Sequence, residues 1–448
     1  MTNSTLTLAG SNVSSNTETS KETSAHATQP TSATWFQSLA RKWVLSGLNR
    51  LSQGSLILEE NGHQHRFGVG VPEYRVHIQH PEFWPQLAFG GSVGAGEAFM
   101  AGDWQCDDLT GLLRFLLKNR AVLDGMETGL ARFSAPLRSQ LHWLNRNTRA
   151  GSRRNIAAHY DLGNDFYQLW LDETLMYSCA IFDQPEMSLH AASTAKLERI
   201  CQKLDLKPGD HVLEIGTGWG GFALHAASRY GCRVTTTTLS RQQYDMARQR
   251  IETAGLSHRV ELLLSDYRDL TGQYDKLVSV EMVEAVGAAH LHTYFKQCAQ
   301  LLKPDGIMFL QAITIADQRY AAALKSVDFI QKHIFPGGFL PSVTALTQSM
   351  TQAGDLRTVH LEDIGPHYAE TLTRWRDNFL ARIEAVRDLG YTPLFIRMWL
   401  FYLSYCEAGF LERDIGTVQM LLAKPGWRGT PVLGAVLGTA LGRSRSHR

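Results

Sequence analysis

The stretch "HVLEIGTGWGGFALHAA" (residues 211–227) decides the fold. An apolar run typical of a β-strand leads into a glycine-rich turn, and small residues typical of a helix follow the turn. Gly216, Gly218 and Gly221 have the G-x-G-x-x-G spacing, in which glycines let the backbone approach a bound nucleotide closely. The stretch therefore predicts the first strand, ligand-binding turn and first helix of a doubly wound α/β domain.

Strands and helices alternate after this turn. Helical patterns at 240–255 and 292–302 lie between further strand patterns that are rich in β-branched or apolar residues, and those strand patterns fall at 232–240, 259–266, 274–280 and 302–314. This alternation predicts a parallel, doubly wound sheet of the Rossmann-like kind.

The composition of the 448-residue chain is that of a globular protein with room for two domains and tails. Lys and Arg (44) balance Asp and Glu (43), so the charge predicts neither a nucleic-acid partner nor an acidic substrate. Six cysteines without a CxxC pair indicate neither a metal site nor a disulfide framework and are typical of a cytoplasmic protein. The N-terminus lacks a signal-peptide pattern, and the longest apolar stretch, 398–406, has about half of the roughly 20 residues of a membrane span.

The chain divides into five regions of different composition. Residues 1–33 are rich in Ser, Thr, Asn and Ala, and we expect a disordered arm because they bury too little apolar surface to fold. A small α+β domain is expected at 34–130, a basic linker at 131–155, the catalytic domain at 156–428 and a basic tail at 429–448.

Within the small domain, the pattern at 55–68 predicts a hairpin around an Asn-Gly turn, and alternation at 73–79 predicts a further strand. Residues 93–104 and 109–120 have helical patterns. This region has no obvious catalytic cluster, so we expect the chemistry in the later domain.

The basic linker has no acidic residue between Glu127 and Asp161, and two interpretations stay open. It is a solvated face, or it meets anionic lipid headgroups, which attract each nearby basic residue by about 1 kcal/mol. The residues concerned surround Trp143 and are Arg132, Arg138, Arg146, Arg149, Arg153 and Arg154.

The acidic residues around the glycine turn bear on the identity of the cofactor. An NAD site needs an acid at the end of the second strand, but that strand ends "TTTTLS" (235–240) and the next acid is Asp245. Glu214 instead precedes the first glycine, where it suits a cofactor with a cationic amino-acid end, and Asp266 ends the third strand, where it suits an adenine amino group. This combination resembles the S-adenosylmethionine-dependent methyltransferases.

Longer motifs resemble one family among these enzymes. They are "HYDLGNDFYQLWLDETLMYSCAIF" (159–182), "DYRDL" (266–270), "VSVEMVEAVG" (278–287), "HIFPGGFLPS" (333–342) and "PHYAETLTRW" (366–375). In this order they are similar to the cyclopropane-fatty-acyl-phospholipid synthase and mycolic acid methyltransferase family, over roughly residues 155–415.

The resemblance implies a class I methyltransferase fold and methyl transfer from S-adenosylmethionine to a cis double bond of a phospholipid acyl chain. It implies that a bicarbonate ion then removes a proton from the new methyl group, and that a cyclopropane ring closes. The enzyme is expected in the cytoplasm, at the inner face of the membrane, with the phospholipid bilayer as its partner; a homodimer is kept as a hypothesis.

The resemblance also implies site residues. Those of the bicarbonate pocket are Cys179, Glu284, Ile313 and Tyr368, and the resemblance also implies Cys406 as an active-site cysteine. With Glu214 from the argument above, the expected cofactor residues are Tyr177, Ser178, Glu214, Gly216, Gly218, Gly220, Thr238, Leu239, Ser240, Gln243, Asp266 and Tyr267.

One position departs from the family. Gln311 stands in "FLQAIT" where the cyclopropane synthases carry a histidine that binds bicarbonate, and an amide can donate a hydrogen bond but cannot take a proton. We expect cyclopropane formation, with a ring-free, methylated acyl chain as the alternative. A lipid-binding protein without catalysis is a third hypothesis, which the intact cofactor motif and Glu284 argue against.

Overall fold

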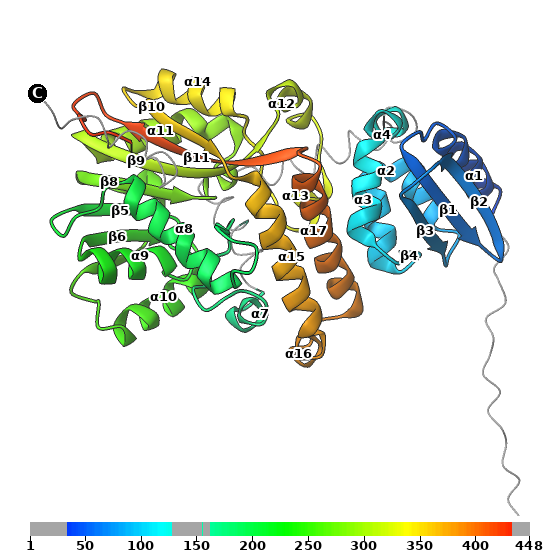
Figure 1. The fold of residues 1–448 in the computed structure, drawn as a ribbon, viewed down its shortest axis with the longest axis horizontal. Coiled ribbons are helices and arrows are strands. Elements are labelled where there is room, and N and C mark those ends of the chain that lie inside the picture. Colours follow the sequence, from blue (N-terminus) through cyan, green and yellow to red (C-terminus); the bar gives the residue numbers. More distant parts are fainter. Residues whose placement is uncertain (1–33, 128–154, 156–161, 432–448) are drawn as a thin grey trace, which may run out of the picture.

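The computed structural model of the protein describes residues 34–127, 155 and 162–431 (Figure 1). The predicted arm (1–33), the linker arginines and the tail beyond residue 431 lie outside the described residues. Figure 1 shows the larger sheet in the left part of the molecule, the smaller sheet at the right, and α15 (Gly365–Ala381) and α17 (Pro393–Leu411) between them.

The larger sheet has seven strands in the order β10-β11-β9-β8-β5-β6-β7. The five strands expected from the sequence are all present, and β5, β6, β7, β8 and β9 pair in parallel. The predicted parallel, doubly wound sheet is confirmed for these five strands, and β11, which the sequence did not predict, inserts antiparallel between β9 and β10. The bounds are β5 (His211–Ile215), β6 (Arg233–Thr238), β7 (Val260–Leu264), β8 (Tyr274–Val280), β9 (Leu302–Ile315), β10 (Arg357–Asp363) and β11 (Ile415–Ala423).

Helices cover both faces of this sheet. Alternate residues of β5 face opposite sides: Val212 packs with α8, α9 and α10, whereas Leu213 and Ile215 pack with α11 and α14. The doubly wound arrangement therefore follows from burial on both faces. These helices are α8 (Leu189–Lys203), α9 (Gly221–His225), α10 (Arg241–Thr253), α11 (Leu291–Leu301) and α14 (Val343–Ala353).

The N-terminal part forms a four-stranded sheet, β2-β1-β3-β4, with the expected hairpin and strand. The helix expected at 93–104 is the second segment of a helix that is kinked at Gly91 (φ 59°), and it stops at Ala101 because Gly102 adopts a left-handed conformation and Trp104 begins β4. The elements are α1 (Trp35–Leu48), β1 (Gly54–Glu60), β2 (His63–Val69), β3 (Glu73–Ile78), α2 (Phe83–Ala101), β4 (Trp104–Cys106), α3 (Leu109–Lys118) and α4 (Arg120–Glu127).

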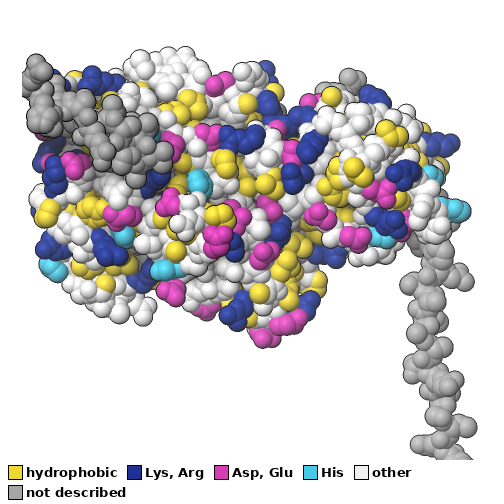
Figure 2. Space-filling view, viewed as in Figure 1, with side chains coloured by type: hydrophobic (Ala, Val, Ile, Leu, Met, Phe, Trp, Pro, Cys, Tyr) yellow, Lys and Arg dark blue, Asp and Glu magenta, His cyan; other side chains and the backbone are white. Residues whose placement is uncertain are grey.

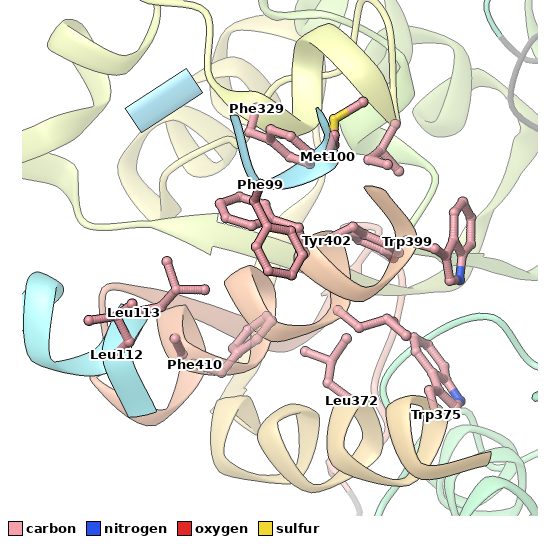
Figure 3. Packing of buried hydrophobic residues seen from close by; sticks show 14 of the residues in the cluster. Phe99, Met100, Leu112, Leu113, Phe329, Leu372, Trp375, Trp399, Tyr402 and Phe410 are labelled. Atoms are coloured by element: carbon pink, nitrogen blue, oxygen red, sulfur yellow. The ribbon is translucent and has the colours of Figure 1, made fainter. Parts of the chain in front are cut away.

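One hydrophobic cluster joins the N-terminal helices to the helices beside the larger sheet. Figure 3 shows Phe99 of α2 near Tyr402 of α17, with Leu372 and Trp375 of α15 in the same cluster. The remaining helices of this part of the chain are α7 (Asn164–Gln168), α12 (Asp317–Ala323), α13 (Phe329–His333), α15 (Gly365–Ala381), α16 (Ile383–Asp388) and α17 (Pro393–Leu411).

The helix α17 is long and apolar enough to cross a membrane by length and composition. More than half of its apolar window is buried inside the molecule, where it packs against α2, α3 and α15. It is therefore a core helix of this fold. On the face shown in Figure 2, basic and acidic side chains are interspersed, in keeping with the net charge of +1.

Candidate active site

The candidate site lies where the parallel strands end. In a doubly wound sheet, ligands bind beyond the carboxyl ends of the strands, next to the point where the strand order reverses. Here β5 has β6 on one side and β8 on the other, so the segments that follow these three strands meet at that edge. Gly216, Ser240 and Glu281 each lie in such a segment.

The glycine turn after β5 has the conformation that the sequence predicted. Gly216, Gly218 and Gly220 have φ of 103°, 53° and 85°, which side chains rarely tolerate. The amide of Gly216 donates to the carbonyl of Thr237 at 3.1 Å, which ties the turn to β6. A Cβ at Gly216 would lie 3.2 Å from the Cγ atom of Met282. The turn thus forms a cradle that needs glycine and fits a closely approaching ligand.

Glu214 lies below this turn and is buried. Its carboxylate accepts a hydrogen bond from the Thr236 hydroxyl at 2.6 Å, and the Thr217 hydroxyl lies 2.7 Å from that of Thr236. Burial raises the pKa of Glu214 to about 8, although the bond from Thr236 opposes the shift. A cationic ammonium group beside it would favour the charged form. Glu214 and the glycine turn therefore fit the amino-acid part of S-adenosylmethionine.

The residues expected at the ribose lie together after β6. The Thr238 hydroxyl donates to Oε1 of Gln243 at 3.0 Å, and the Ser240 hydroxyl accepts from the Gln243 amide at the start of α10. Leu239 lies between Thr238 and Ser240 in the chain and is partly exposed. The expected adenine acid, Asp266, is held by Nε and Nη2 of Arg268 at 2.8 and 2.6 Å, an ion pair that the sequence did not predict. Tyr267 follows Asp266 in a short 3₁₀ helix.

Tyr177 and Ser178, expected at the cofactor, precede α8. The Tyr177 hydroxyl lies 2.7 Å from that of Tyr402 on α17. The Ser178 hydroxyl accepts a bond of 2.6 Å from Lys196, a fully buried lysine of α8. Burial lowers the pKa of Lys196 to about 8.

A carboxylate that the sequence analysis did not single out lies at the centre of the expected bicarbonate pocket. Glu281 accepts hydrogen bonds from the Cys179 amide (3.0 Å), the Gln311 amide group (2.8 Å) and the Tyr368 hydroxyl (2.6 Å). Its backbone has φ of 48°, a left-handed conformation that is uncommon for a residue with a side chain. Such strain persists where the surrounding structure imposes it, often at functional sites.

The second carboxyl group of this cluster belongs to Glu284. Its Oε1 atom accepts the Ile313 amide at 2.5 Å, and its buried Oε2 atom has no hydrogen-bond partner among the described residues. Burial, together with repulsion by Glu281, raises the pKa of Glu284 to about 8. Burial also raises the pKa of Glu281, but three hydrogen bonds and the charge of Lys196 oppose that shift. The two carboxyl groups thus differ: Glu284 is protonated at pH 7, and Glu281 has the donors that a carboxylate needs.

The donors expected for bicarbonate are therefore used by the chain itself. Cys179, Gln311 and Tyr368 donate to Glu281, and the Ile313 amide donates to Glu284. The residues present do not fit a separate bicarbonate ion in addition to these two carboxyl groups.

The two cysteines named by the resemblance occupy different places. Cys179 is within the cluster, but it contributes its amide, and burial raises the pKa of its thiol well above the usual value. Cys406 lies on α17 and, within the described part of the chain, makes no hydrogen bond to the carboxyl cluster; burial raises the pKa of its thiol too. Neither thiol is activated as a nucleophile.

The sequence carried a signal for Glu281. The residue comes directly after β8, and the residues that follow parallel strands meet at the ligand edge. The stretch "VSVEMVEAVG" (278–287) holds two glutamates three residues apart, of which the predicted site contains only the second, Glu284.

The fold and the glycine cradle define the class of protein: the chain is a class I S-adenosylmethionine-dependent methyltransferase. Among solved structures, the cyclopropane synthase MmaA2 from Mycobacterium tuberculosis matches with a TM-score of 0.57 and 29% identity, over 61% of this chain and 98% of that one. A mycolic acid cyclopropane synthase complexed with SAH and CTAB matches with a TM-score of 0.57 and 30% identity over the same shares.

The chain belongs to the family described as mycolic acid cyclopropane synthetase, which its residues 147–420 match. It is 43% identical to a tuberculostearic acid methyltransferase from Mycobacterium tuberculosis, over 75% of this chain and 80% of that protein. It is 38% identical to the cyclopropane-fatty-acyl-phospholipid synthase of Escherichia coli K12, over 78% of this chain and 87% of that protein. The chain is therefore an enzyme that methylates a lipid with S-adenosylmethionine as its cofactor.

Proposed function

We propose that the enzyme transfers a methyl group to the cis double bond of an unsaturated acyl chain in a membrane phospholipid. The phospholipid synthase among its relatives supports this substrate class. When bound, S-adenosylmethionine supplies an electrophilic methyl group. The π electrons of the alkene would form the new carbon–carbon bond as the methyl–sulfur bond breaks and leaves its electron pair on sulfur, and a positive charge would remain on the neighbouring chain carbon.

Aromatic residues beside the glycine turn suit this reaction. The ring of Tyr177 lies 5.4 Å from that of Trp170 and 5.3 Å from that of Trp375, and Tyr167 lies 4.9 Å from Trp219. Their apolar edges exclude water that would capture the cation, and their faces attract positive charge.

We infer that Glu281 takes the proton whose loss ends the reaction. The observation that carries this proposal is that its carboxylate accepts the three donors expected to hold bicarbonate. Burial raises its pKa, which makes it a better proton acceptor than an exposed glutamate. The electron pair of the broken carbon–hydrogen bond then neutralises the cation.

Two products satisfy this chemistry. Removal of a proton from the new methyl group closes a cyclopropane ring, whereas removal of a proton from the chain leaves a methylated, ring-free alkene. One observation favours the second product as an alternative: the acceptor is fixed to the end of β8 and cannot follow the cation as a free ion can. The relative named a tuberculostearic acid methyltransferase supports keeping both candidates.

Three further expectations remain proposals. We propose that the enzyme works in the cytoplasm, bound peripherally to the inner face of the membrane. We keep residues 34–130 and 156–428 as the division between a small domain and the catalytic domain. A homodimer remains a hypothesis.

The test is expression in a bacterium that lacks its own synthase, followed by mass spectrometry of fatty-acid methyl esters. A product that is one CH₂ heavier and does not take up hydrogen supports the ring; a heavier product that does take up hydrogen supports the ring-free chain. Unchanged fatty acids would refute the proposed substrate class.

The base is tested with purified enzyme in carbon-dioxide-free buffer. If Glu281 is the acceptor, turnover on unsaturated phospholipid vesicles is unaffected by removing or adding bicarbonate. A requirement for bicarbonate would refute the role of Glu281 while leaving the methyltransferase assignment intact.

A further inference from the structure

A line of buried polar side chains runs from the helix α8 to Glu281. The ammonium group of Lys203 donates to Oε1 of Gln419 at 2.6 Å, and Nε2 of Gln419 donates to Oε1 of Gln311 at 3.0 Å. The Nε2 atom of Gln311 then donates to Glu281 at 2.8 Å. Both glutamine side chains are fully buried. Buried amides of this kind have to satisfy their hydrogen bonds within the protein, so each link matters.

The direction of these hydrogen bonds is fixed at one end. A lysine ammonium group has donors and no acceptor, so Gln419 must turn its carbonyl oxygen toward Lys203. Its NH₂ group therefore faces Gln311, which must accept with its own oxygen. The NH₂ group of Gln311 is then left to donate to Glu281, which is the arrangement that favours a carboxylate there.

The strand order explains why these residues meet. Gln419 is directly opposite Gln311 in the antiparallel pair β11–β9, and Val280 is opposite Gln311 in the parallel pair β8–β9. The backbone amide of Glu281 donates to the Gln311 carbonyl at 2.8 Å, which fixes Glu281 at the inner end. The outer end is fixed by Glu362 of β10, 2.7 Å from Lys203.

We propose that Lys203, Gln419 and Gln311 form a relay that positions Gln311 as a hydrogen-bond donor and thereby keeps Glu281 in its carboxylate form. Lys203 and Gln419 are positioning residues, because they act on Glu281 through Gln311. Their effect on turnover rests on the proposed function, whereas their effect on the ionisation of Glu281 is measurable without substrate.

Other groups also face the two ends of the relay. Glu281 faces the Tyr368 hydroxyl of α15 and the Cys179 amide, with Glu284 and the Lys196 ammonium group nearby. Lys203 faces Glu362, with Arg199 and His360 nearby. Because these groups stay in place when Gln419 is changed, a shift in the titration of Glu281 reports on the relay.

The sharpest variant is Gln419→Glu, which keeps the size of the side chain and its contact with Lys203. A carboxylate at 419 cannot donate to Gln311, so the Gln311 amide turns over and presents its oxygen to Glu281. Gln419→Met breaks the relay without adding charge. We expect the midpoint of Glu281 ionisation to move to higher pH in both, by about one pH unit or more in Gln419→Glu and by less in Gln419→Met.

The measurement is an infrared titration of the full chain, in which the carboxylate band of Glu281 is identified by its loss in Glu281→Gln. The matched control is Thr417→Val, a fully buried position on β11 that takes no part in the relay. Its Glu281 band should titrate as in the unmodified enzyme. If the enzyme methylates lipid, the pH below which turnover falls should rise by the same amount in the Gln419 variants.

An unchanged Glu281 titration in both Gln419 variants would overturn the proposal. If the Gln419 variants do not fold, the double variant Lys203→Gln with Glu362→Gln carries the same test, because a neutral amide no longer fixes the direction of the relay. Absence of lipid methylation with a shifted titration would refute the proposed function and leave the relay standing.

Discussion

The cofactor cradle and the carboxyl cluster lie at the same edge of the sheet, but they are built differently. The cradle comes from one turn, residues 216–221, between β5 and the start of α9. The cluster needs Cys179 from before α8, Glu281 from after β8, Gln311 from β9 and Tyr368 from α15. The difference teaches that a ligand site made of one turn is visible in the sequence, whereas a carboxyl cluster assembled from four segments depends on the complete fold.

The largest effect is expected when the cluster is broken without touching the cradle. Glu281→Gln keeps the shape of the side chain but removes the proton acceptor, so we expect turnover to fall by about 10²- to 10⁴-fold. S-adenosylmethionine affinity, measured by calorimetry, should change little because the cradle is intact. Near-normal turnover on unsaturated phospholipid vesicles would contradict the assigned role.

The converse change breaks the cradle and leaves the cluster in place. Gly216→Ala forces a side chain into φ of 103° and places its Cβ 3.2 Å from Met282. We expect cofactor affinity to fall by about 5- to 150-fold, from a strain of about 1–3 kcal/mol. The control Gly255→Ala also has positive φ (68°), but its Cβ meets nothing within 4 Å, so cofactor affinity should be retained.

A smaller effect, on the free energy of unfolding, is expected at Glu362, which holds Lys203 at the outer end of the relay. Burial raises the pKa of Glu362, but bonds from Arg199 and Lys203 outweigh that effect and lower it to about 2. The stabilisation is complete above the unfolded pKa of about 4.3 and is lost as the pH falls toward 2. Because the side chain is about one-third exposed, we expect a contribution of about 1 kcal/mol.

The measurement is urea unfolding of the unmodified chain and of Glu362→Gln between pH 6 and pH 3. The free energy of unfolding should fall less steeply with acid in the variant. Parallel curves would show that the ion pair contributes nothing.

The smallest effect is expected for Glu284→Gln, which tests whether the two carboxyl groups of the cluster have different roles. The Glu284 pKa of about 8 means that this residue is protonated at pH 7, so Glu284→Gln replaces one neutral donor and acceptor by another. Turnover at pH 7 should change by less than about threefold. Above pH 8 the unmodified enzyme should lose activity as Glu284 ionises beside Glu281, and the variant should lose less. A large loss at pH 7 would show that Glu284 acts as a charged group.

The sequence predicted the five parallel strands because each is a β-branched or apolar run between turn signals, as "RVTTTT" (233–238) illustrates. It did not predict β10 or β11. In β10, charged residues and a weak alternation hide the strand, and β11 follows a helix and enters the sheet in reverse. The local hydrophobic pattern of a strand carries no information about which earlier strands it pairs with or in which direction.

The sequence likewise predicted some residues of the candidate site and missed others. The glycine turn and Glu214 follow from adjacent residues, and the family resemblance located Glu284 and Tyr368. Glu281 was overlooked because its partners are 30 to 102 residues away in the chain. The sequence identified Gln311 as a departure, but its consequence depends on Gln419, which only the strand pairing places beside it.

The position of β11 has a consequence for synthesis on the ribosome. It is the last strand along the described chain, yet it lies inside the sheet, between β9 and β10. While the chain emerges, β10 has no neighbour to join until residues 415–423 are released. The pairing of β10 with β11 is therefore the last step in building the sheet, and the same step brings Gln419 beside Gln311.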